Sequence, residues 1–218
     1  MLMLNMQFDR TVVIDTDDME WEASAMPGVW RKQLAHEAAE HGHSTSLVRY
    51  DPGSSFPTHQ HPQGEEILVL EGVLSDEHGD YGNGTYIRNP PGSEHTPFSE
   101  KGCVLLVKRD QFDSEDHLSV CIDTANTAWM PGEDKIEVMP LHDFGHESVA
   151  LYHWSVGARH SSHQHFGGEE IFVISGALLD EYGAYPQGSW IRNPHNSEHC
   201  PYVESETVIW IKTGHLLP

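Results

Sequence analysis

The sequence predicts an all-β protein built of two similar domains in tandem. Three observations support this class: a long internal repeat, apolar runs of strand length at corresponding places in both halves, and glycines and prolines at matching spacings. The 218 residues divide naturally into two units of about 100, each long enough for one small β core. We expect a first domain at 1–108, a connection at 109–126 and a second domain at 127–218.

The internal repeat has a fixed offset of 104 residues. Residues 53–95 and 157–199 align without a gap and share 23 identities in 43 positions, which is far too many for chance. Similarity at the same offset reaches back to residues 26–28, which recur at 130–132. The chain therefore contains an internal duplication of one unit.

Two pairs of apolar runs predict the central strands. Residues 67–70 and 104–107 recur at 171–174 and 208–211, and each run is apolar on both faces. Such strands must be covered on both sides. We expect one face to line the core and the other to pack on an outer sheet, on the other half or on a second subunit.

One segment gives conflicting signals. Residues 33–41 have a helical composition, but their repeat counterpart contains Pro140, which a helix interior does not tolerate. We therefore expect loop or strand here. Residues 109–126 carry charges, Ser and Thr without a motif, which is typical of a connection.

Each repeat carries a set of candidate metal ligands. His59 and His61 are alternate residues, so on a strand both point to one face. Glu65 reaches that face if the chain turns through Gly64, and His95 must arrive from another strand. The second repeat supplies His163, His165, Glu169 and His199 at the same spacings. Imidazole nitrogens with one carboxylate favour a divalent first-row metal, one per domain.

The ligand set predicts an open site. Three neutral histidines and one carboxylate leave a divalent ion with one positive charge and about two open positions if it is octahedral. Structural zinc sites favour paired cysteines, but the only cysteines are Cys103, Cys121 and Cys200. The donors accept zinc, iron, manganese or nickel, and no residue is singled out as catalytic.

These motifs resemble the two signature motifs of the cupin family, in both halves. The residues Gly-Glu-Glu-Ile-Leu-Val-Leu-Glu-Gly at 64–72, Asp76-Glu77, and Ile-Arg-Asn-Pro-Pro-Gly-Ser-Glu-His at 87–95 are similar to the cupin-like domain of ChrR-type anti-sigma factors. Residues 153–215 resemble it again. The resemblance implies two jelly-roll barrels, or double-stranded β-helices, with one metal each.

The resemblance also implies a function, a metal-binding sensor or regulatory protein of a stress response or of anti-sigma regulation, with a protein partner. ChrR-type proteins resemble a fusion with an N-terminal zinc-binding helical module that contains a His, three residues, Cys, two residues, Cys arrangement. No cysteine precedes Cys103 here, so we do not expect that module. The alternative is a mononuclear non-heme iron or manganese dioxygenase acting on a small oxygenated substrate.

Other polar residues recur around the ligands. Asp76, Glu77 and Arg88 return as Asp180, Glu181 and Arg192. Paired carboxylates can act as acid and base and an arginine can hold a substrate carboxylate, but a salt bridge between neighbouring strands is the favoured interpretation.

The second repeat also has histidines of its own. We expect His160 and His195 to be surface or hydrogen-bonded residues rather than extra ligands or proton shuttles of the second metal. The exchange of Gly92 for Asn196 predicts a conserved turn, because Asn tolerates positive φ better than most residues.

Composition narrows the function classes. A net charge of −22 argues against nucleic-acid binding, because an acidic surface repels phosphates. No apolar run approaches the ~20 residues that span a bilayer, and the N-terminus has no secretory pattern. Three cysteines cannot all pair, which suits the cytoplasm. We expect a monomer with paired barrels or a homodimer.

Overall fold

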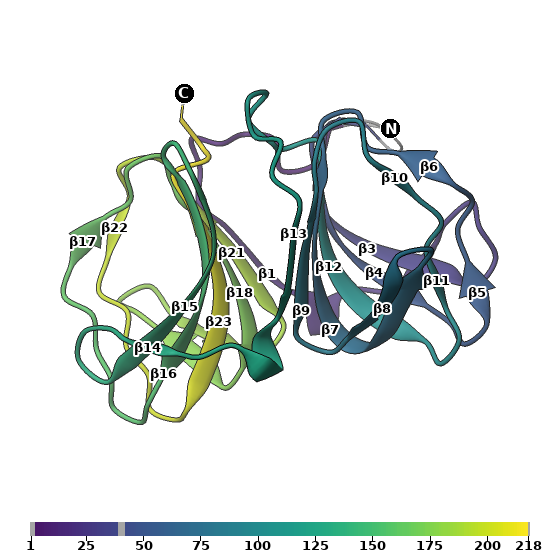
Figure 1. The fold of residues 1–218 in the computed structure, drawn as a ribbon. Coiled ribbons are helices and arrows are strands. Elements are labelled where there is room, and N and C mark those ends of the chain that lie inside the picture. The colour runs from purple at the N-terminus through teal and green to yellow at the C-terminus, as the bar shows by residue number, and fades with distance from the viewer. Residues whose placement is uncertain (1–2, 39–41, 218) are drawn as a thin grey trace. The chain divides into compact units, whose positions relative to one another are not determined.

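The computed structural model describes residues 3–38 and 42–217 and is built almost entirely of β-strands (Figure 1). The chain forms two compact units. The first contains Met1–Met6 and Glu20–Thr127, and the second contains Gln7–Met19 and Ala128–Pro218. The predicted all-β class, with one jelly-roll barrel from each repeat, is confirmed.

The first unit is a main sheet that faces a set of shorter strand pairs. The main sheet has the order β13-β9-β7-β12-β4-β3-β2, while β5 pairs with β11, and both β8 and β11 pair with β7. Strands β6 and β10 form a separate pair. The elements are β2 (Glu22–Ala23), β3 (Val29–His36), β4 (Ser44–Tyr50), β5 (Ser54–Ser55), β6 (His59–Gln60), β7 (Glu65–Asp76), β8 (Gly79–Gly82), β9 (Thr85–Asn89), β10 (Glu94–His95), β11 (Phe98–Ser99), β12 (Cys103–Arg109), β13 (Val120–Asp123) and the 3₁₀ turn η2 (Thr124–Asn126).

Strand β7 connects the two layers because it bends at Gly72. Its first part pairs with β12, and its last part, from Val73, pairs with β8. Gly72 has φ +72°, and a Cβ atom there would lie 2.1 Å from the carbonyl oxygen of Gly102. Only glycine fits this conformation and this close approach.

The core of the first unit lies between these layers. The apolar runs predicted to be strands supply its centre, and Leu74 and the partly buried Phe56 and Tyr81 cover it from the side of the shorter strands. The buried members are Val29, Val48, Tyr50, Ile67, Val69, Leu74, Ile87, Cys103, Leu105 and Val107. Several of these apolar residues lie beside the candidate ligands His59 and His95.

The second unit repeats this plan. Its main sheet has the order β1-β21-β18-β23-β16-β15-β14, with β17 paired to β22 and β19 paired to β20. Gly176, at φ +77°, separates β18 from β19 where Gly72 bends β7. The elements are β1 (Val12–Asp15), the 3₁₀ turn η1 (Thr16–Asp18), β14 (Met130–Pro131), β15 (Ile136–Phe144), β16 (Glu147–Trp154), β17 (His163–Gln164), β18 (Glu169–Ser175), β19 (Ala177–Leu179), β20 (Ala184–Pro186), β21 (Ser189–Asn193), β22 (Glu198–His199) and β23 (Thr207–Thr213).

Each main sheet has an edge strand from a segment outside its repeat block: β1 precedes the first block but pairs in the second unit, and β13 lies between the blocks and pairs in the first. Strand β1 belongs to the second unit and pairs with β21, where Ile14 lies opposite Trp190. Strand β13 belongs to the first unit and pairs with β9, where Ile122 lies opposite Tyr86. The two strands are equivalent, since each is followed by a 3₁₀ turn capped by an Asp side chain.

This pairing gives the units different borders from the domains expected at 1–108 and 127–218. The expected connection at 109–126 contains β13 and η2, and residues 7–19 lie in the second unit. Strands β1 and β13 are short and have no periodic apolar pattern, so the sequence did not predict these borders. In the segment 33–41, residues up to His36 belong to β3, which agrees with the expectation of loop or strand, and 39–41 lie outside the described residues.

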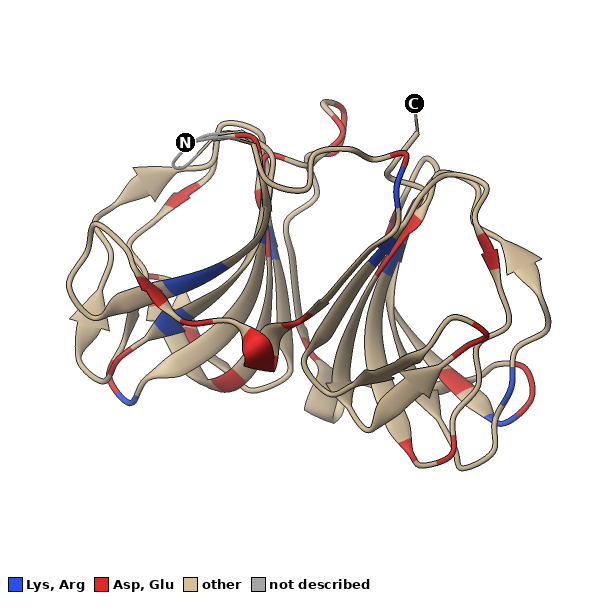
Figure 2. Ribbon diagram, turned by 180° about the vertical axis from the view of Figure 1, so that it is seen from behind, with Lys and Arg blue, Asp and Glu red and all other residues tan. Residues whose placement is uncertain are grey.

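Among residues 3–38 and 42–217, no helix is long and apolar enough to cross a membrane. Acidic residues are distributed over both units (Figure 2), in keeping with the net charge of −22.

Candidate metal centres

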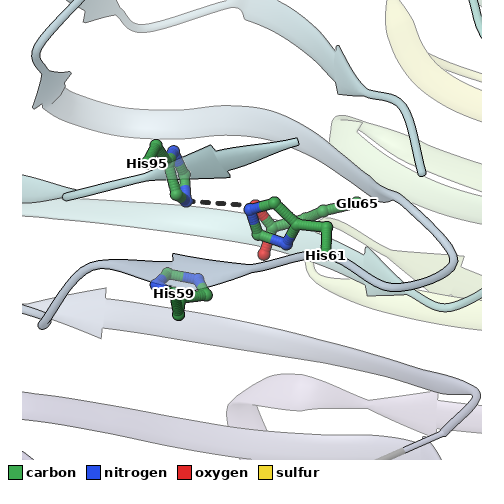
Figure 3. A group of neighbouring side chains, drawn as sticks. All are labelled: His59, His61, Glu65 and His95. Carbon is green, nitrogen blue, oxygen red and sulfur yellow. Dashed lines mark ion pairs between the residues drawn. The ribbon is translucent and has the colours of Figure 1, made fainter. Parts of the chain in front are cut away.

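The structure brings the four candidate ligands of the first repeat together. His59 lies in β6, His61 follows it, Glu65 begins β7, and His95 lies in β10. One ligand atom from each residue lies within 4.8 Å of every other. Figure 3 shows the three imidazoles and the carboxylate facing a common space.

Local backbone structure explains this convergence. Strands β6 and β10 pair antiparallel with His95 directly opposite His59. The chain then turns at Gly64, with φ +80°, so that Glu65 enters the first strand position on the same side as the histidines. The backbone N–H of His61 donates to the carbonyl of Ser93 at 2.9 Å, which ties the ligand loop to the segment before His95.

The distances within the first cluster suit a shared cation. The ring centroids of the three histidines are 4.8 to 4.9 Å apart. Nε2 of His61 and Nε2 of His95 each lie 3.5 Å from Oε2 of Glu65. His61, Glu65 and His95 are buried, while His59 is half-buried at the rim. A metal here would be bound by three buried ligands and would remain accessible on the side of His59.

The second cluster has the same arrangement. His163, His165, Glu169 and His199 also lie within 4.8 Å of one another by their ligand atoms. Their ring centroids are separated by 4.6 to 5.2 Å. The Glu169 carboxylate lies 3.3 Å from Nδ1 of His165 and 3.7 Å from Nε2 of His199.

Carboxylates and carbonyls behind the clusters fix the ring orientations. Nδ1 of His95 lies 3.3 Å from Oδ2 of Asp76, and Nδ1 of His199 lies 3.2 Å from Oδ2 of Asp180. Nδ1 of His59 lies 3.0 Å from the carbonyl oxygen of Pro57. A partner at Nδ1 holds each ring in the tautomer that presents Nε2 to a metal.

Further hydrogen bonds position these second-layer carboxylates and the ligand Glu. The Tyr81 hydroxyl donates to Asp76 at 3.0 Å, and the Tyr185 hydroxyl donates to Asp180 at 2.9 Å. The Asn193 amide donates to Glu169 at 3.2 Å. These hydrogen bonds fix the positions of the three carboxylates.

Burial favours the neutral form of the four buried ligand histidines. Desolvation, followed by the charges of His59 and Arg109, lowers the pKa of His61 to about 4. Desolvation, followed by the charges of the neighbouring histidines, lowers the pKa of His165 to about 3. Burial also lowers the pKa of His95 and of His199. Neutral imidazole is the form that binds a metal, so the protein prepares the donors at physiological pH.

Burial disfavours the charged form of Glu169, the carboxylate ligand of the second cluster. Burial raises the pKa of Glu169 to about 7, although the hydrogen bond from Asn193 opposes the rise. A divalent cation beside Glu169 would favour the ionised carboxylate. A bound cation would therefore stabilise the charged form of Glu169 that burial disfavours.

Nitrogens that make no hydrogen bond support the same assignment. Within residues 3–38 and 42–217, Nε2 of His61 and Nε2 of His165 are buried and make no hydrogen bond. In His61 this nitrogen faces the Glu65 carboxylate, whereas in His165 it is Nδ1 that faces the Glu169 carboxylate. Buried polar atoms without hydrogen bonds are uncommon and costly, and a metal ion would satisfy Nε2 of His61. The two histidine and glutamate clusters can therefore hold one metal ion per barrel.

Each cluster opens into a cavity. The first cavity, about 50 Å³, is lined by His59, Glu65 and His95 together with apolar core residues. The second, about 280 Å³, is lined by the ligands of the second cluster and by Trp154, His160 and Phe166 among others. A metal in either cluster would thus face a space that a small molecule can enter.

One interpretation from the sequence is wrong. Asp76 and Asp180 do not pair with Arg88 and Arg192, because they contact the ligand histidines instead. Arg88 is fully buried and contacts Asp116 at 2.6 Å, away from the metal cluster. Residues alternate between the two faces of a strand, so the recurrence of these residues in both repeats did not reveal which carboxylate each arginine contacts.

The additional histidines of the second repeat differ in position. Nδ1 of His195 accepts the backbone N–H of Gly167 at 2.8 Å, as expected for a hydrogen-bonded residue. His160 lines the second cavity, with its ring centroid 4.3 Å from that of the ligand His163. Asn196 adopts φ +62° where Gly92 has +84°, so the predicted conserved turn is confirmed.

The sequence interpretation did not reveal which residues support the ligands of the two sites. Asp76 with Tyr81, and Asp180 with Tyr185, orient ligand histidines, and Asn193 holds Glu169. All of these residues recur between the repeats, with Asn89 corresponding to Asn193. That recurrence marks them as important, but only the fold shows what they contact.

Comparisons with solved structures agree with this architecture. A candidate dioxygenase from Nostoc punctiforme aligns with a TM-score of 0.78 at 15% identity, over 95% of this chain and 84% of that one. Oxalate decarboxylase from Lactobacillus farciminis aligns with a TM-score of 0.67 at 12% identity, over 94% and 86%. Salicylate 1,2-dioxygenase from Pseudaminobacter salicylatoxidans aligns with a TM-score of 0.66 at 11% identity, over 84% and 76%. At such identities the likeness shows the fold alone.

Sequence comparison identifies the family. A search of curated proteins finds no significant match. The family model of the ChrR cupin-like domain matches twice, at residues 9–113 and 117–217. These matches span both metal clusters and nearly all of the sequence. The chain therefore belongs to the ChrR cupin-like domain family and contains two copies of that domain.

Proposed function

We propose that this protein is a metal-dependent dioxygenase that acts on a small oxygenated substrate. The observation that carries the proposal is that ligands of each set lie on the wall of a cavity: His59, Glu65 and His95 in the first barrel, and all four candidate ligands in the second. A closed structural site would have no such opening. A bound iron or manganese ion would supply redox chemistry and open positions for O₂ and substrate.

The protein's own residues would prepare the donors and limit access of water. Burial keeps His61 and His95 neutral, and Asp76 orients His95 toward the cluster. Apolar side chains, including Ile67 and Leu105, form much of the first cavity wall. Such a wall excludes bulk water and strengthens the electrostatic effect of the ligands on a bound molecule.

The structural neighbours include enzymes of this kind. One is a salicylate 1,2-dioxygenase and another an oxalate decarboxylase, so the same fold occurs in enzymes named for small carboxylic acids. Fold alone does not determine function, and for this chain the argument rests on the open ligand sets.

A second candidate function is a metal-dependent sensor. The observation that favours it is the match to the ChrR cupin-like domain in both halves. In this case oxidation or ligand binding at the metal would change how the protein holds a regulatory partner. The same cavities would then serve detection of a small molecule rather than turnover.

Metal identity and oxygen consumption distinguish the two functions. Untagged protein should be purified without oxygen from its native host and its metals measured by plasma mass spectrometry. Iron or manganese, followed by O₂ uptake with small diketones, thiols or phenolic acids, supports the dioxygenase. Zinc in both sites without O₂ uptake contradicts it, because zinc has no redox chemistry with which to activate O₂. A His59→Ala variant is the control for chemistry at the first site.

A further inference from the structure

The two cavities differ in charge. Arg31 and Arg109 line the first cavity beside His59, Glu65 and His95. The residues that line the second cavity include neither arginine nor lysine. The difference lies inside otherwise equivalent barrels, so it distinguishes the ligands that the two sites can bind.

The strand register explains why both arginines face the interior of the first barrel. Arg109 lies directly opposite the ligand Glu65 in the pairing of β12 with β7. Arg31 lies opposite Val48, a core residue, in the pairing of β3 with β4. Residues that face each other across an antiparallel pair point to the same side of the sheet. Both arginines therefore point toward the cavity.

Contacts of the two side chains agree with these positions. The Arg31 guanidinium lies 5.9 Å from the ring centroid of Phe56, which also lines the cavity. Nε of Arg109 donates to Oγ of Ser44 at 3.2 Å. The Arg31 side chain thus lies against the cavity wall, and Arg109 is tied to the neighbouring strand β4 beside the cavity.

The corresponding positions of the second barrel carry uncharged residues. Thr213 lies opposite the ligand Glu169, as Arg109 does opposite Glu65. Val138 lies opposite Tyr152, as Arg31 does opposite Val48. Because Tyr152 and Glu169 follow Val48 and Glu65 by the same repeat offset, these four positions are true structural equivalents.

This difference changes the electrostatics of the first site. With three neutral imidazoles and one carboxylate, a divalent ion retains one positive charge. Arg31, which lies opposite Glu22 in the pairing of β2 with β3, and Arg109 place two guanidinium groups on the wall of the same cavity. Such a site attracts an anion, even though the protein as a whole has a net charge of −22 and repels one. Arginine also presents a planar fork of donors that matches a carboxylate.

The first cavity also limits size. Its volume of about 50 Å³ compares with about 280 Å³ for the second. Since one water needs on the order of 10–15 Å³ by this measure, the first cavity holds roughly four water molecules. A carboxylic acid of a few heavy atoms fits this space.

We propose that the first barrel, and not the second, binds a small carboxylate between the metal position and the pair Arg31 and Arg109. This assignment rests on the proposed function in requiring an open metal, and it names the substrate class of that site. Val138 and Thr213 leave the second cavity without such a pair of arginines.

Calorimetric titration with glycolate tests the assignment. Wild-type protein with its resident metal is titrated under nitrogen, with uncharged glycolamide as the matched ligand. We expect about one glycolate per chain and at least tenfold weaker binding of glycolamide. Arg31→Gln and Arg109→Gln should each weaken glycolate binding about tenfold or more, while metal content stays at the wild-type level.

Matched variants at the second site make the result specific. Thr213→Gln should leave glycolate affinity unchanged, and Arg109→Lys should retain more affinity than Arg109→Gln. Equal affinity of wild type and Arg109→Gln, or an equal loss in Thr213→Gln, would overturn the assignment. Because binding is measured without O₂, absence of oxygen uptake would contradict the dioxygenase proposal while leaving this result to stand by itself.

Discussion

The carboxylate of Asp76 lies 3.3 Å from Nδ1 of His95 and thereby determines which nitrogen of that ring faces the first ligand cluster. Asp180 holds His199 in the same way at 3.2 Å in the second unit. Outer carboxylates of this kind orient metal-binding histidines and increase their basicity.

Replacing Asp76 with Asn should weaken metal binding at the first site by about 10- to 100-fold and leave the second unchanged. The amide cannot stabilise the same tautomer of His95 as a carboxylate does. Competition with a chelator, followed by metal analysis, measures the two affinities. Asp80→Asn is a matched control, since Asp80 accepts a hydrogen bond from Ser75 and contacts no ligand. Equal effects of the two substitutions would refute an orienting role for Asp76.

Removing one ligand should empty one site. His95→Ala should leave about one metal per chain in place of two, because the two ligand sets come from separate units. His199→Ala should give the same stoichiometry by emptying the other site. Plasma mass spectrometry of both variants checks the result, and loss of all metal after either single change would show that the sites are not independent.

Metal-free protein should lose stability in acid. The pKa of His61 in the folded state, about 4, lies below its ordinary value of about 6.5, so the unfolded chain binds more protons between these values. The stability present above pH 6.5 is therefore lost as the pH falls toward 4. Thermal unfolding of chelator-treated protein at several pH values tests this, and His61→Leu should reduce the slope.

Glu169 gives a contribution of opposite sign in the second unit. Burial raises its pKa to about 7, so the folded state binds more protons than the unfolded state between about pH 4.5 and pH 7. That contribution is present in acid and decreases as the pH rises through 7. Glu169→Gln should remove it.

For His61, a dependence of stability on pH that is the same in wild type and in His61→Leu would contradict the assignment to His61.

Gly72→Ala should destabilise the first unit strongly, by about 2 kcal/mol or more. The added Cβ would combine positive φ with a distance of 2.1 Å to the Gly102 carbonyl oxygen. Gly92→Asn is the control, because Gly92 has open space around it and Asn196 already adopts this conformation in the second unit. Denaturant unfolding of both variants should show a large loss for the first and a small change for the second.

Proline in either edge strand should loosen the unit to which that strand belongs. Ile14→Pro should increase amide exchange in β21, and Ile122→Pro should increase it in β9, since proline removes a donor and disfavours strand pairing. Hydrogen exchange with mass spectrometry resolves the two regions. Increased exchange in β9 after Ile14→Pro, with β21 unchanged, would contradict the strand assignment.

The sequence by itself determined the duplication, the all-β class and the ligand sets. A repeated pattern at one offset is visible without coordinates, and alternate residues on a strand place His59 and His61 on one face for geometric reasons. Gly64 and Gly92 announced turns because positive φ restricts residue choice. These features depend on local geometry, which a sequence records directly.

Only the tertiary structure decided which distant residues meet. The partners of Asp76 and Arg88, the exchange of β1 and β13, and the approach of Arg31 and Arg109 to one cavity all depend on strand register and pairing across long separations. A shift of one residue in register reverses the face of every side chain, and no local pattern encodes that choice. The ligands could be read from the sequence, whereas their supports and the charge of each cavity required the fold.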